Sequence, residues 1–165
     1  MRIGTIASHS ALNIISGARA EGFETVLFCT PDRRQFYEAF GLGKDIVEVA
    51  SFDELVEREV DEDIVLIPHG SFVAYIGAEK LLKSDLRLFG NKELLRWEED
   101  RSLKSRLMRE SGLLVPREYS SVDEIETPVI VKTHGAAGGV GYFIAKDAAE
   151  ARAKMQVATE YSIQE

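Results

Sequence analysis

Short apolar runs alternate with amphipathic stretches along the first ninety residues of the chain. Each apolar run has the length of a buried strand, and the stretches between the runs carry apolar residues at helical spacing, as Leu12, Ile15 and Ala18 do. Strands and helices that alternate in this way favour parallel βαβ units. The first half therefore predicts an open, Rossmann-like α/β sheet with helices on both faces. The predicted strands are 3–8, 24–30, 45–51, 63–71 and 86–91, and the predicted helices are 9–23, 32–41, 52–60 and 73–84.

The pattern changes from Asn91 onward. Residues 91–112 form a long helical stretch in this interpretation, with a break near Asp100 and with Asn91 as the N-cap. A short loop then links two further strands, which makes them antiparallel. We expect two domains, 1–90 and 91–165, of which the second is partly antiparallel. The later predicted elements are strands at 113–119, 128–132 and 142–145, a helix at 148–158 and a last strand at 161–165.

Two of the predicted strands end in polar residues. His9 and Ser10 follow the first strand, and His69 and Ser71 follow the fourth. Parallel strands end at one edge of their sheet, where such sheets bind ligands, so we expect His9 and Ser71 to line one pocket. Plainer alternatives are that Ser10 caps a helix, that His69 is a structural turn residue and that His9 is a surface turn residue.

Composition removes several functional classes. The chain has 165 residues, of which 29% are charged, and a formal net charge of −8, so we expect no basic surface for nucleic acid. Its one cysteine, Cys29, excludes an intrachain disulfide and suits a reducing compartment. No apolar stretch approaches the roughly 20 residues that cross a bilayer. We expect a cytoplasmic protein that binds neither nucleic acid nor membrane.

A lysine and a glycine-rich loop follow the apolar strand 128–132. Lys132 precedes four loop glycines, and a loop of this kind turns backbone N–H groups toward an anion. A P-loop is excluded because no helix follows and no Gly-Lys-Ser/Thr occurs. The alternatives are a hairpin lid over a triphosphate, with Lys132 beneath it, and a flexible hairpin with an exposed lysine. The glycines are Gly135, Gly138, Gly139 and Gly141.

The order of short motifs in the second half resembles the ATP-grasp superfamily. Asp100 and Arg101 begin a helical segment, "GLLVP" closes it, Lys132 precedes the glycine loop, and "IQE" at 163–165 stands where a hinge strand is expected. Over essentially the whole chain, "SHSAL", "PHGSF" and "LRWE" resemble the archaeal formate-dependent FAICAR synthetases, also called formate–phosphoribosylaminoimidazolecarboxamide ligases. These three stretches are far more specific than the glycine loop.

That resemblance implies an ATP-dependent carbon–nitrogen ligase of purine nucleotide (IMP) biosynthesis. ATP would phosphorylate formate to formyl phosphate, and the 5-amino group of AICAR would attack it to give FAICAR. The implied fold is a pre-ATP-grasp Rossmann-like domain at 1–90 and an incomplete ATP-grasp lid subdomain at 91–165. The residues that match the family's AICAR-binding positions are His9, Ser10 and Ser71. Those that match its ATP-binding positions are Arg101, Lys132, Gly135, Gly138, Gly139, Gly141, Gln164 and Glu165, the last two at the hinge.

The resemblance also implies partners. ATP, formate and AICAR are the expected small molecules, with Mg²⁺ as the metal and a homo-oligomer as the assembly. The family's metal ligands are expected beyond residue 165, so we expect no metal site in this chain and no catalysis by it alone. Its loop has Ala137 and Val140 where the family usually has basic residues, and His134 where it usually has proline. A paralogue with another substrate, another ATP-grasp carboxylate–amine ligase and a non-catalytic nucleotide- or AICAR-binding module stay open as alternatives.

Overall fold

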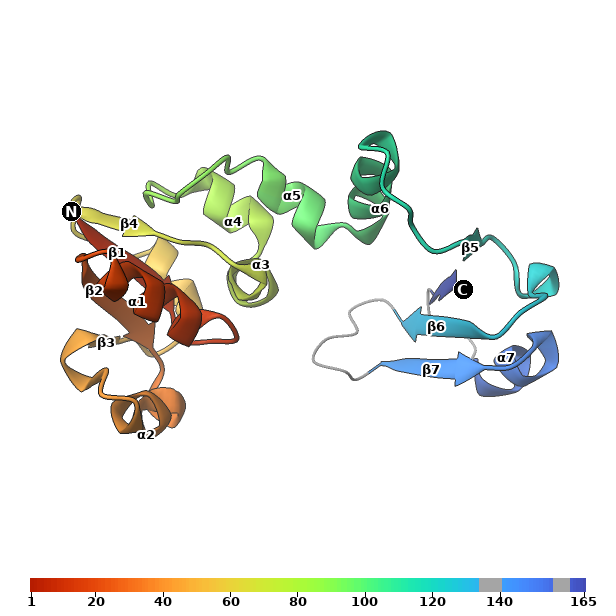
Figure 1. The fold of residues 1–165 in the computed structure, drawn as a ribbon, viewed down its shortest axis with the longest axis horizontal. Coiled ribbons are helices and arrows are strands. Elements are labelled where there is room, and N and C mark those ends of the chain that lie inside the picture. The colour runs from red at the N-terminus through yellow and green to blue at the C-terminus, as the bar shows by residue number, and fades with distance from the viewer. Residues whose placement is uncertain (134–140, 156–160) are drawn as a thin grey trace. The chain divides into compact units, whose positions relative to one another are not determined.

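The computed structural model describes residues 1–133, 141–155 and 161–165, which form two compact units. The first unit is Met1–Leu107 and the second is Met108–Glu165 (Figure 1). Each unit has its own sheet and its own buried core. None of the helices within the described ranges combines the length and the apolar character needed to span a bilayer.

The first unit is built on a parallel sheet, as the alternating pattern predicted. Its strands are β1 (Arg2–Ile6), β2 (Glu24–Cys29), β3 (Ile46–Glu48) and β4 (Ile64–Leu66), in the order β3-β2-β1-β4. All three strand pairs are parallel, and β1 lies between β2 and β4. A Cβ atom on Gly4 of β1 would lie 2.8 Å from Leu66 Cδ2 and 2.9 Å from Ile64 Cγ2, so only glycine fits there without a shift of β4 side chains. Because β1 and β4 pair in parallel, their carboxyl ends are neighbours at one edge of the sheet.

The helices of the first unit depart from prediction at one glycine. They are α1 (Ala11–Ala20), α2 (Pro31–Ala39), α3 (Gly70–Ile76) and α4 (Ala78–Lys83), with 3₁₀ segments η1 (Gly43–Asp45) and η2 (Phe52–Val56). The single helix predicted over 73–84 is wrong, because Gly77 has a φ of 89° and ends α3 in a left-handed conformation. The α4 helix then restarts at Ala78.

The strands predicted over 45–51 and 63–71 are only β3 and β4, and two other predicted elements are almost lost. The helix predicted over 52–60 is only the 3₁₀ segment η2, which buries Phe52 and Leu55. The fifth strand, predicted over 86–91, reduces to one parallel bridge between Leu88 and Leu66 of β4. Both segments are short pieces that cover an apolar core, and neither continues a hydrogen-bonded ladder or helix.

The long helix predicted over 91–112 is two helices, α5 (Leu94–Glu99) and α6 (Arg101–Glu110). They meet at Asp100, where the break was predicted, and the Asp100 Oδ1 accepts a hydrogen bond from the backbone N–H of Ser102 at 2.8 Å. Asn91 is not the N-cap of α5: its Oδ1 accepts from the Glu93 N–H at 3.0 Å, one turn before the helix.

The first core lies between the sheet and these helices. Ile6, Leu27, Phe72 and Leu81 are fully buried in it, and Leu95 of α5 joins them at 8% exposure. The compact unit thus extends to residue 107. The functional division into domains 1–90 and 91–165 stays a prediction.

The second unit is an antiparallel sheet with one helix, as its short connections predicted. Its elements are β5 (Glu118–Tyr119), η3 (Val122–Glu124), β6 (Val129–Thr133), β7 (Tyr142–Ala145), α7 (Ala148–Lys154) and β8 (Tyr161–Gln164). The strand order is β5-β8-β6-β7. Val131 and Ile163, which pair across β6 and β8, face the buried core of this unit. Lys132, paired with Tyr142 and Ser162, alternates to the opposite face.

Candidate functional site

The two polar strand ends of the first unit meet through a pair of serines. Ser8, just beyond β1, donates its hydroxyl to the Ser71 hydroxyl at the start of α3, with 2.9 Å between the oxygens. His9, predicted to line one pocket with Ser71, lies exposed in the same turn as Ser8. Its Nδ1 lies 3.1 Å from the Ser10 hydroxyl. The two strand ends that the sequence predicted to share one edge of the sheet therefore do so, and Ser8 makes the contact between them.

Two of these residues stand at helix N-termini. Ser10 is the N-cap residue of α1 but makes no capping side-chain hydrogen bond, so the plain capping interpretation does not describe its hydroxyl. His69 is the N-cap of α3, and its Nδ1 accepts from the Ser71 N–H at 3.4 Å. The structural turn role predicted as the plainer alternative for His69 is therefore what the geometry shows.

The other ring nitrogen of His69 is buried. Within the described part of the chain, His69 Nε2 has no hydrogen-bond partner. Burial lowers the pKa of His69, with the charge of His9 acting in the same direction and the Ile6 backbone opposing it. A neutral ring whose Nδ1 accepts a hydrogen bond carries its proton on Nε2. His69 thus holds a buried N–H donor beside the meeting point of β1 and α3.

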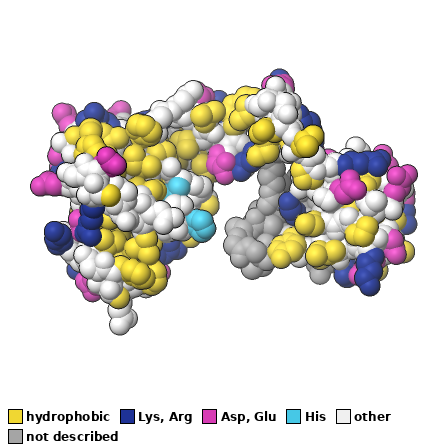
Figure 2. All heavy atoms as spheres, in the orientation of Figure 1, with side chains coloured by type: hydrophobic (Ala, Val, Ile, Leu, Met, Phe, Trp, Pro, Cys, Tyr) yellow, Lys and Arg dark blue, Asp and Glu magenta, His cyan; other side chains and the backbone are white. Residues whose placement is uncertain are grey.

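A hollow of about 410 Å³ opens at the carboxyl ends of β1 and β2. His9 lines one side of it and Arg33 and Phe36 of α2 line another. Figure 2 shows histidine side chains, in cyan, on one face of the first unit. Ser71 is not among the lining residues, and it reaches the hollow only through Ser8. The full lining is Ser8, His9, Leu12, Asp32, Arg33, Phe36 and Tyr37.

Side chains of α2 and α3 hold the turn that carries His9. Arg33 Nη1 donates to the Ala7 carbonyl at 2.8 Å, and the Tyr37 hydroxyl donates to the Ser8 carbonyl at 3.0 Å. Arg33 Nη2 also donates to the Tyr75 hydroxyl at 3.0 Å. This bond, with a contribution from Ser8, lowers the pKa of Tyr75. Sequence reasoning missed Arg33, although a cation directly after a predicted parallel strand was the signal available.

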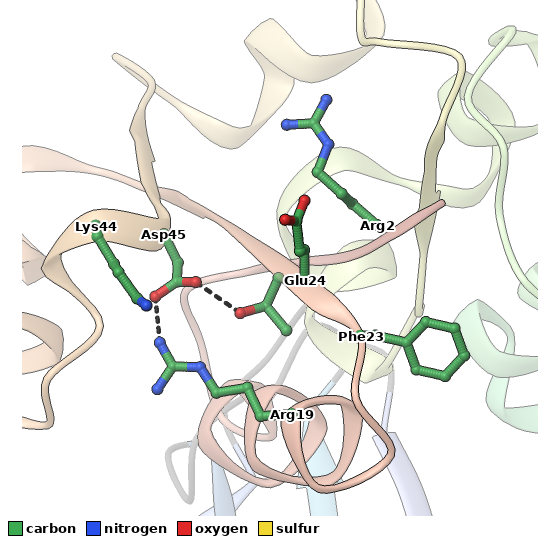
Figure 3. A pocket seen from close by; sticks show the side chains of 7 residues that line it. Arg2, Arg19, Phe23, Glu24, Lys44 and Asp45 are labelled. Carbon is green, nitrogen blue, oxygen red and sulfur yellow. Dashed lines mark hydrogen bonds and ion pairs between the residues drawn. The ribbon is translucent and has the colours of Figure 1, made fainter.

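A second hollow, of about 560 Å³, lies at the opposite edge of the same sheet. Figure 3 shows Arg2 and Glu24, the first residues of β1 and β2, on its wall. Asp45 accepts hydrogen bonds there from Arg19 and, at 2.7 Å, from the Thr25 hydroxyl. Ligands of open parallel sheets sit beyond the carboxyl ends of strands, and this hollow is at the amino ends. We interpret the Asp45 cluster as a structural tie between α1, β2 and η1.

The candidate nucleotide residues of the second unit are partly brought together. Lys132 Nζ donates to Gln164 Oε1 at 2.7 Å, so the lysine of β6 and the predicted hinge of β8 are adjacent. Gln164 Nε2 in turn donates to Glu118 at 3.0 Å, which fixes the orientation of the amide. The Glu165 carboxylate accepts from the Thr127 hydroxyl at 3.2 Å.

The remaining predicted nucleotide residues are only partly described. Gly141 has a φ of 85°, which suits a glycine at the start of β7. Arg101 begins α6, as predicted, and only its backbone is described. Three predicted positions, Gly135, Gly138 and Gly139, lie outside the described residues, as do the departures at 134, 137 and 140. Within the described ranges no group of three or more His, Cys, Asp or Glu side chains is placed to hold a metal ion.

A family model matches most of the chain. The family described as "Protein of unknown function (DUF1246)" matches residues 3–119. The chain belongs to the DUF1246 family.

Curated relatives with the name 5-formaminoimidazole-4-carboxamide-1-(beta)-D-ribofuranosyl 5'-monophosphate synthetase include one from Ignicoccus hospitalis, 42% identical over all of this chain and 50% of the relative. One from Archaeoglobus fulgidus is 46% identical over 87% of this chain and 41% of the relative. The chain spans about half the length of the curated relatives it matches.

Solved structures match this DUF1246 chain over nearly its full length. An IMP biosynthesis protein PurP from Thermococcus kodakaraensis matches 98% of this chain and 49% of its own, with a TM-score of 0.71 and 28% identity. The N5-carboxyaminoimidazole ribonucleotide synthetase from Thermotoga maritima matches with a TM-score of 0.68 and 19% identity, over 99% of this chain and 45% of its own, and supports the fold alone. With the parallel sheet followed by a separate antiparallel sheet, these matches confirm the predicted fold class: a Rossmann-like domain followed by a partly antiparallel, ATP-grasp-type α+β subdomain.

Proposed function

We propose that this chain is part of an ATP- and formate-dependent ligase that converts AICAR to FAICAR in purine nucleotide biosynthesis. The observation that carries the proposal is the junction of the two most family-like turns, in which Ser8 of "SHSAL" bonds Ser71 of "PHGSF" at 2.9 Å beside a hollow lined by His9. The names of the curated relatives and of the PurP structure support the same activity. We further propose that the protein is a cytoplasmic homo-oligomer.

The reaction divides between the two units in this proposal. A formate oxygen attacks the terminal phosphorus of ATP, ADP leaves, and the resulting formyl phosphate is attacked by the 5-amino nitrogen of AICAR. Phosphate leaves and the nitrogen loses a proton, so the new bond is carbon to nitrogen. Formate and the terminal phosphate of ATP are both anions and repel each other. Cations that face them offset this repulsion.

The predicted residues divide into a set that binds AICAR and a set that binds ATP. His9, Ser10 and Ser71 bind AICAR, because their hydroxyl and imidazole groups sit where a parallel sheet presents donors to a ligand. Lys132 faces the nucleotide phosphates, and Gln164 and Glu165 meet the adenine. In the described part of the chain Lys132 is held by a neutral amide rather than by a carboxylate, which leaves its charge available to an anion. This arrangement fits a nucleotide.

Magnesium would neutralise charge on the transferred phosphoryl group. The described residues offer no carboxylate cluster for it, so the proposal assigns its ligands to the part of the protein beyond this chain. Arg101 and the glycines 135–141 complete the proposed ATP-binding set.

Isothermal titration and turnover on the full-length protein test the proposal. ADP release should require both formate and AICAR. His9→Ala should weaken AICAR binding about 10-fold, the loss of one good hydrogen bond, while ATP binding stays unchanged. ATP turnover with another amine in place of AICAR would favour a different carboxylate–amine ligase, and binding without turnover would favour a non-catalytic module. Equal loss of AICAR and ATP binding in His9→Ala would contradict the assignment of His9.

A further inference from the structure

The substrate-binding set lacks a charge that its proposed ligand requires. AICAR is a ribose monophosphate, and a phosphate monoester carries between one and two negative charges at neutral pH. His9, Ser10 and Ser71 supply hydroxyl and imidazole groups but no permanent cation. Hydrogen bonds from a charged donor are roughly twice as strong as neutral ones, so phosphate sites normally contain Arg or Lys. The hollow beside His9 should therefore contain a cation that sequence reasoning did not assign.

Arg33 is the one Lys or Arg among the residues that line this hollow. It enters from α2, at the carboxyl end of β2, whereas His9 enters from the turn after β1. Since β1 and β2 are neighbouring parallel strands, these two residues share one edge of the sheet. Part of the Arg33 side chain, 30%, is exposed, so a ligand in the hollow can reach it.

The guanidinium of Arg33 is held in one orientation before any ligand binds. Its two Nη atoms donate to the Ala7 carbonyl at 2.8 Å and to the Tyr75 hydroxyl at 3.0 Å. Its central carbon lies 5.0 Å from the centre of the Tyr75 ring and 5.3 Å from that of Phe52. These bonds and ring contacts fix the guanidinium plane, which reduces the entropy lost when an anion binds.

The charge of Arg33 is not neutralised by these contacts. Ala7 and Tyr75 contribute neutral oxygens, and the guanidinium has five N–H donors, of which two are used in these bonds. Arg33 forms an ion pair with Asp32, whose Oδ2 lies 3.8 Å from Arg33 Nε and whose side chain is 74% exposed. Such an exposed pair is weak. Arg33 therefore keeps donors and charge for a ligand.

We propose that Arg33 binds the phosphate group of the substrate, which makes this hollow selective for a ribose monophosphate over the uncharged riboside. The inference rests on the proposed function and deepens it, because it assigns the cation that AICAR recognition needs. In this arrangement the phosphate lies between Arg33 and Ser8, which both line the hollow. Phe36, 54% exposed on the same wall, offers an apolar surface to the rest of the ligand.

Calorimetric titration of full-length protein with AICAR and with its riboside tests this inference. Wild type should prefer the phosphorylated ligand. Arg33→Ala should weaken AICAR binding by about 10- to 100-fold, as expected for a lost charge-assisted bond, and leave riboside binding within about 2-fold, so that the preference disappears. Arg33→Lys, which keeps the charge and one donor to the Ala7 carbonyl, should retain part of the preference and guards against a folding defect in the alanine variant.

Arg34→Ala is the matched control, because the neighbouring Arg34 pairs with Glu38 at 2.7 Å and Glu48 at 3.3 Å and does not line the hollow. It should leave both affinities unchanged. Equal loss of AICAR and riboside binding in Arg33→Ala would show that Arg33 only supports the His9 turn and would overturn the inference. An unchanged preference would overturn it as well.

Ribose 5-phosphate separates this inference from the proposed function. Suppose that wild type binds ribose 5-phosphate, that Arg33→Ala abolishes this binding, and that wild type does not formylate AICAR. The phosphate site then stands and the proposed function fails. If AICAR is formylated normally by Arg33→Ala with unchanged KM, the proposed function stands and the phosphate site is wrong.

Discussion

The candidate substrate residues lie in turns of the first unit that other elements hold in place, whereas Lys132 and Gln164 lie on the face of a sheet in the second unit. The turn that carries His9 accepts hydrogen bonds from Arg33 and Tyr37 of α2, and its Ser8 hydroxyl donates to Ser71 of α3. Its geometry is thus set by contacts among elements far apart in the sequence. A pocket made this way is formed before its ligand arrives.

In the second unit the support is a single line of side chains across one sheet. Lys132 bonds Gln164, and Gln164 bonds Glu118, which also bonds Arg109 at 2.5 Å. On the same face, Tyr142 is 52% exposed and Ile144 58% exposed. The contrast teaches that the first unit carries a hollow of its own, while the second holds a half-buried cation on the face of a sheet. Substitutions in the turns of the first unit and on the sheet of the second unit should therefore affect different ligands.

The largest expected effect is on the stability of the first unit. Phe72 is fully buried and Phe89 is 68% exposed, so the same change to alanine compares a core ring with a surface ring. Phe72→Ala should lower the free energy of unfolding of the first unit by about 3–5 kcal/mol, because it removes a large buried side chain and leaves a cavity. Phe89→Ala should cost about 0.5 kcal/mol or less.

Hydrogen exchange read separately over residues 1–107 and 108–165 measures this effect in the full-length protein. Because the chain divides into two compact units, faster exchange in Phe72→Ala should be confined to the first. Equal acceleration in both units would mean that they unfold together. It would contradict the prediction that the substitution destabilises the first unit alone.

The next effect concerns nucleotide and the second unit. Lys132→Met should weaken ATP binding by about 10- to 100-fold, since it removes a charged donor but keeps most of the side-chain length. AICAR binding should stay unchanged, because the AICAR site that we propose lies in the first unit. Lys146→Met is the control: Lys146 is exposed in the same unit, just after β7. A loss of AICAR binding as large as that of ATP would contradict the division of ligands between the units.

The sequence specified the sheets well and the site contacts less well. Apolar periodicity and short connections identified the parallel and antiparallel strands, because both depend on which residues a strand buries. The sequence-based prediction failed at Gly77. This glycine was predicted inside a helix, but it takes a left-handed conformation that only the tertiary structure selects. Sequence reasoning also could not predict the hydrogen bonds of Arg33 with Ala7 and Tyr75, which are distant from it in sequence, although the position of Arg33 after a predicted strand was a usable signal. Contacts of this kind leave no local pattern.

The smallest expected effect is a pH dependence confined to the first unit, through His69. The pKa of His69 is lowered by burial, so the unfolded chain binds a proton more readily than the folded one. The stability contributed by the neutral ring is therefore present above the ordinary histidine pKa of about 6.5 and is lost as pH falls below it. Protonation would also turn Nδ1 into a donor, so that it could no longer accept the hydrogen bond from the Ser71 N–H.

His69→Asn tests this, because asparagine caps a helix well but does not titrate. The variant should lose stability less steeply than wild type between pH 7 and pH 5, in urea titrations that follow the first unit by exchange over residues 1–107. His9→Asn serves as the control, since His9 is exposed and its removal should leave most of the slope in place. If His9→Asn flattened the slope and His69→Asn did not, the exposed histidine at the hollow would be the group that couples protons to folding. The preformed turn, rather than the buried cap, would then be the pH-sensitive part of the first unit.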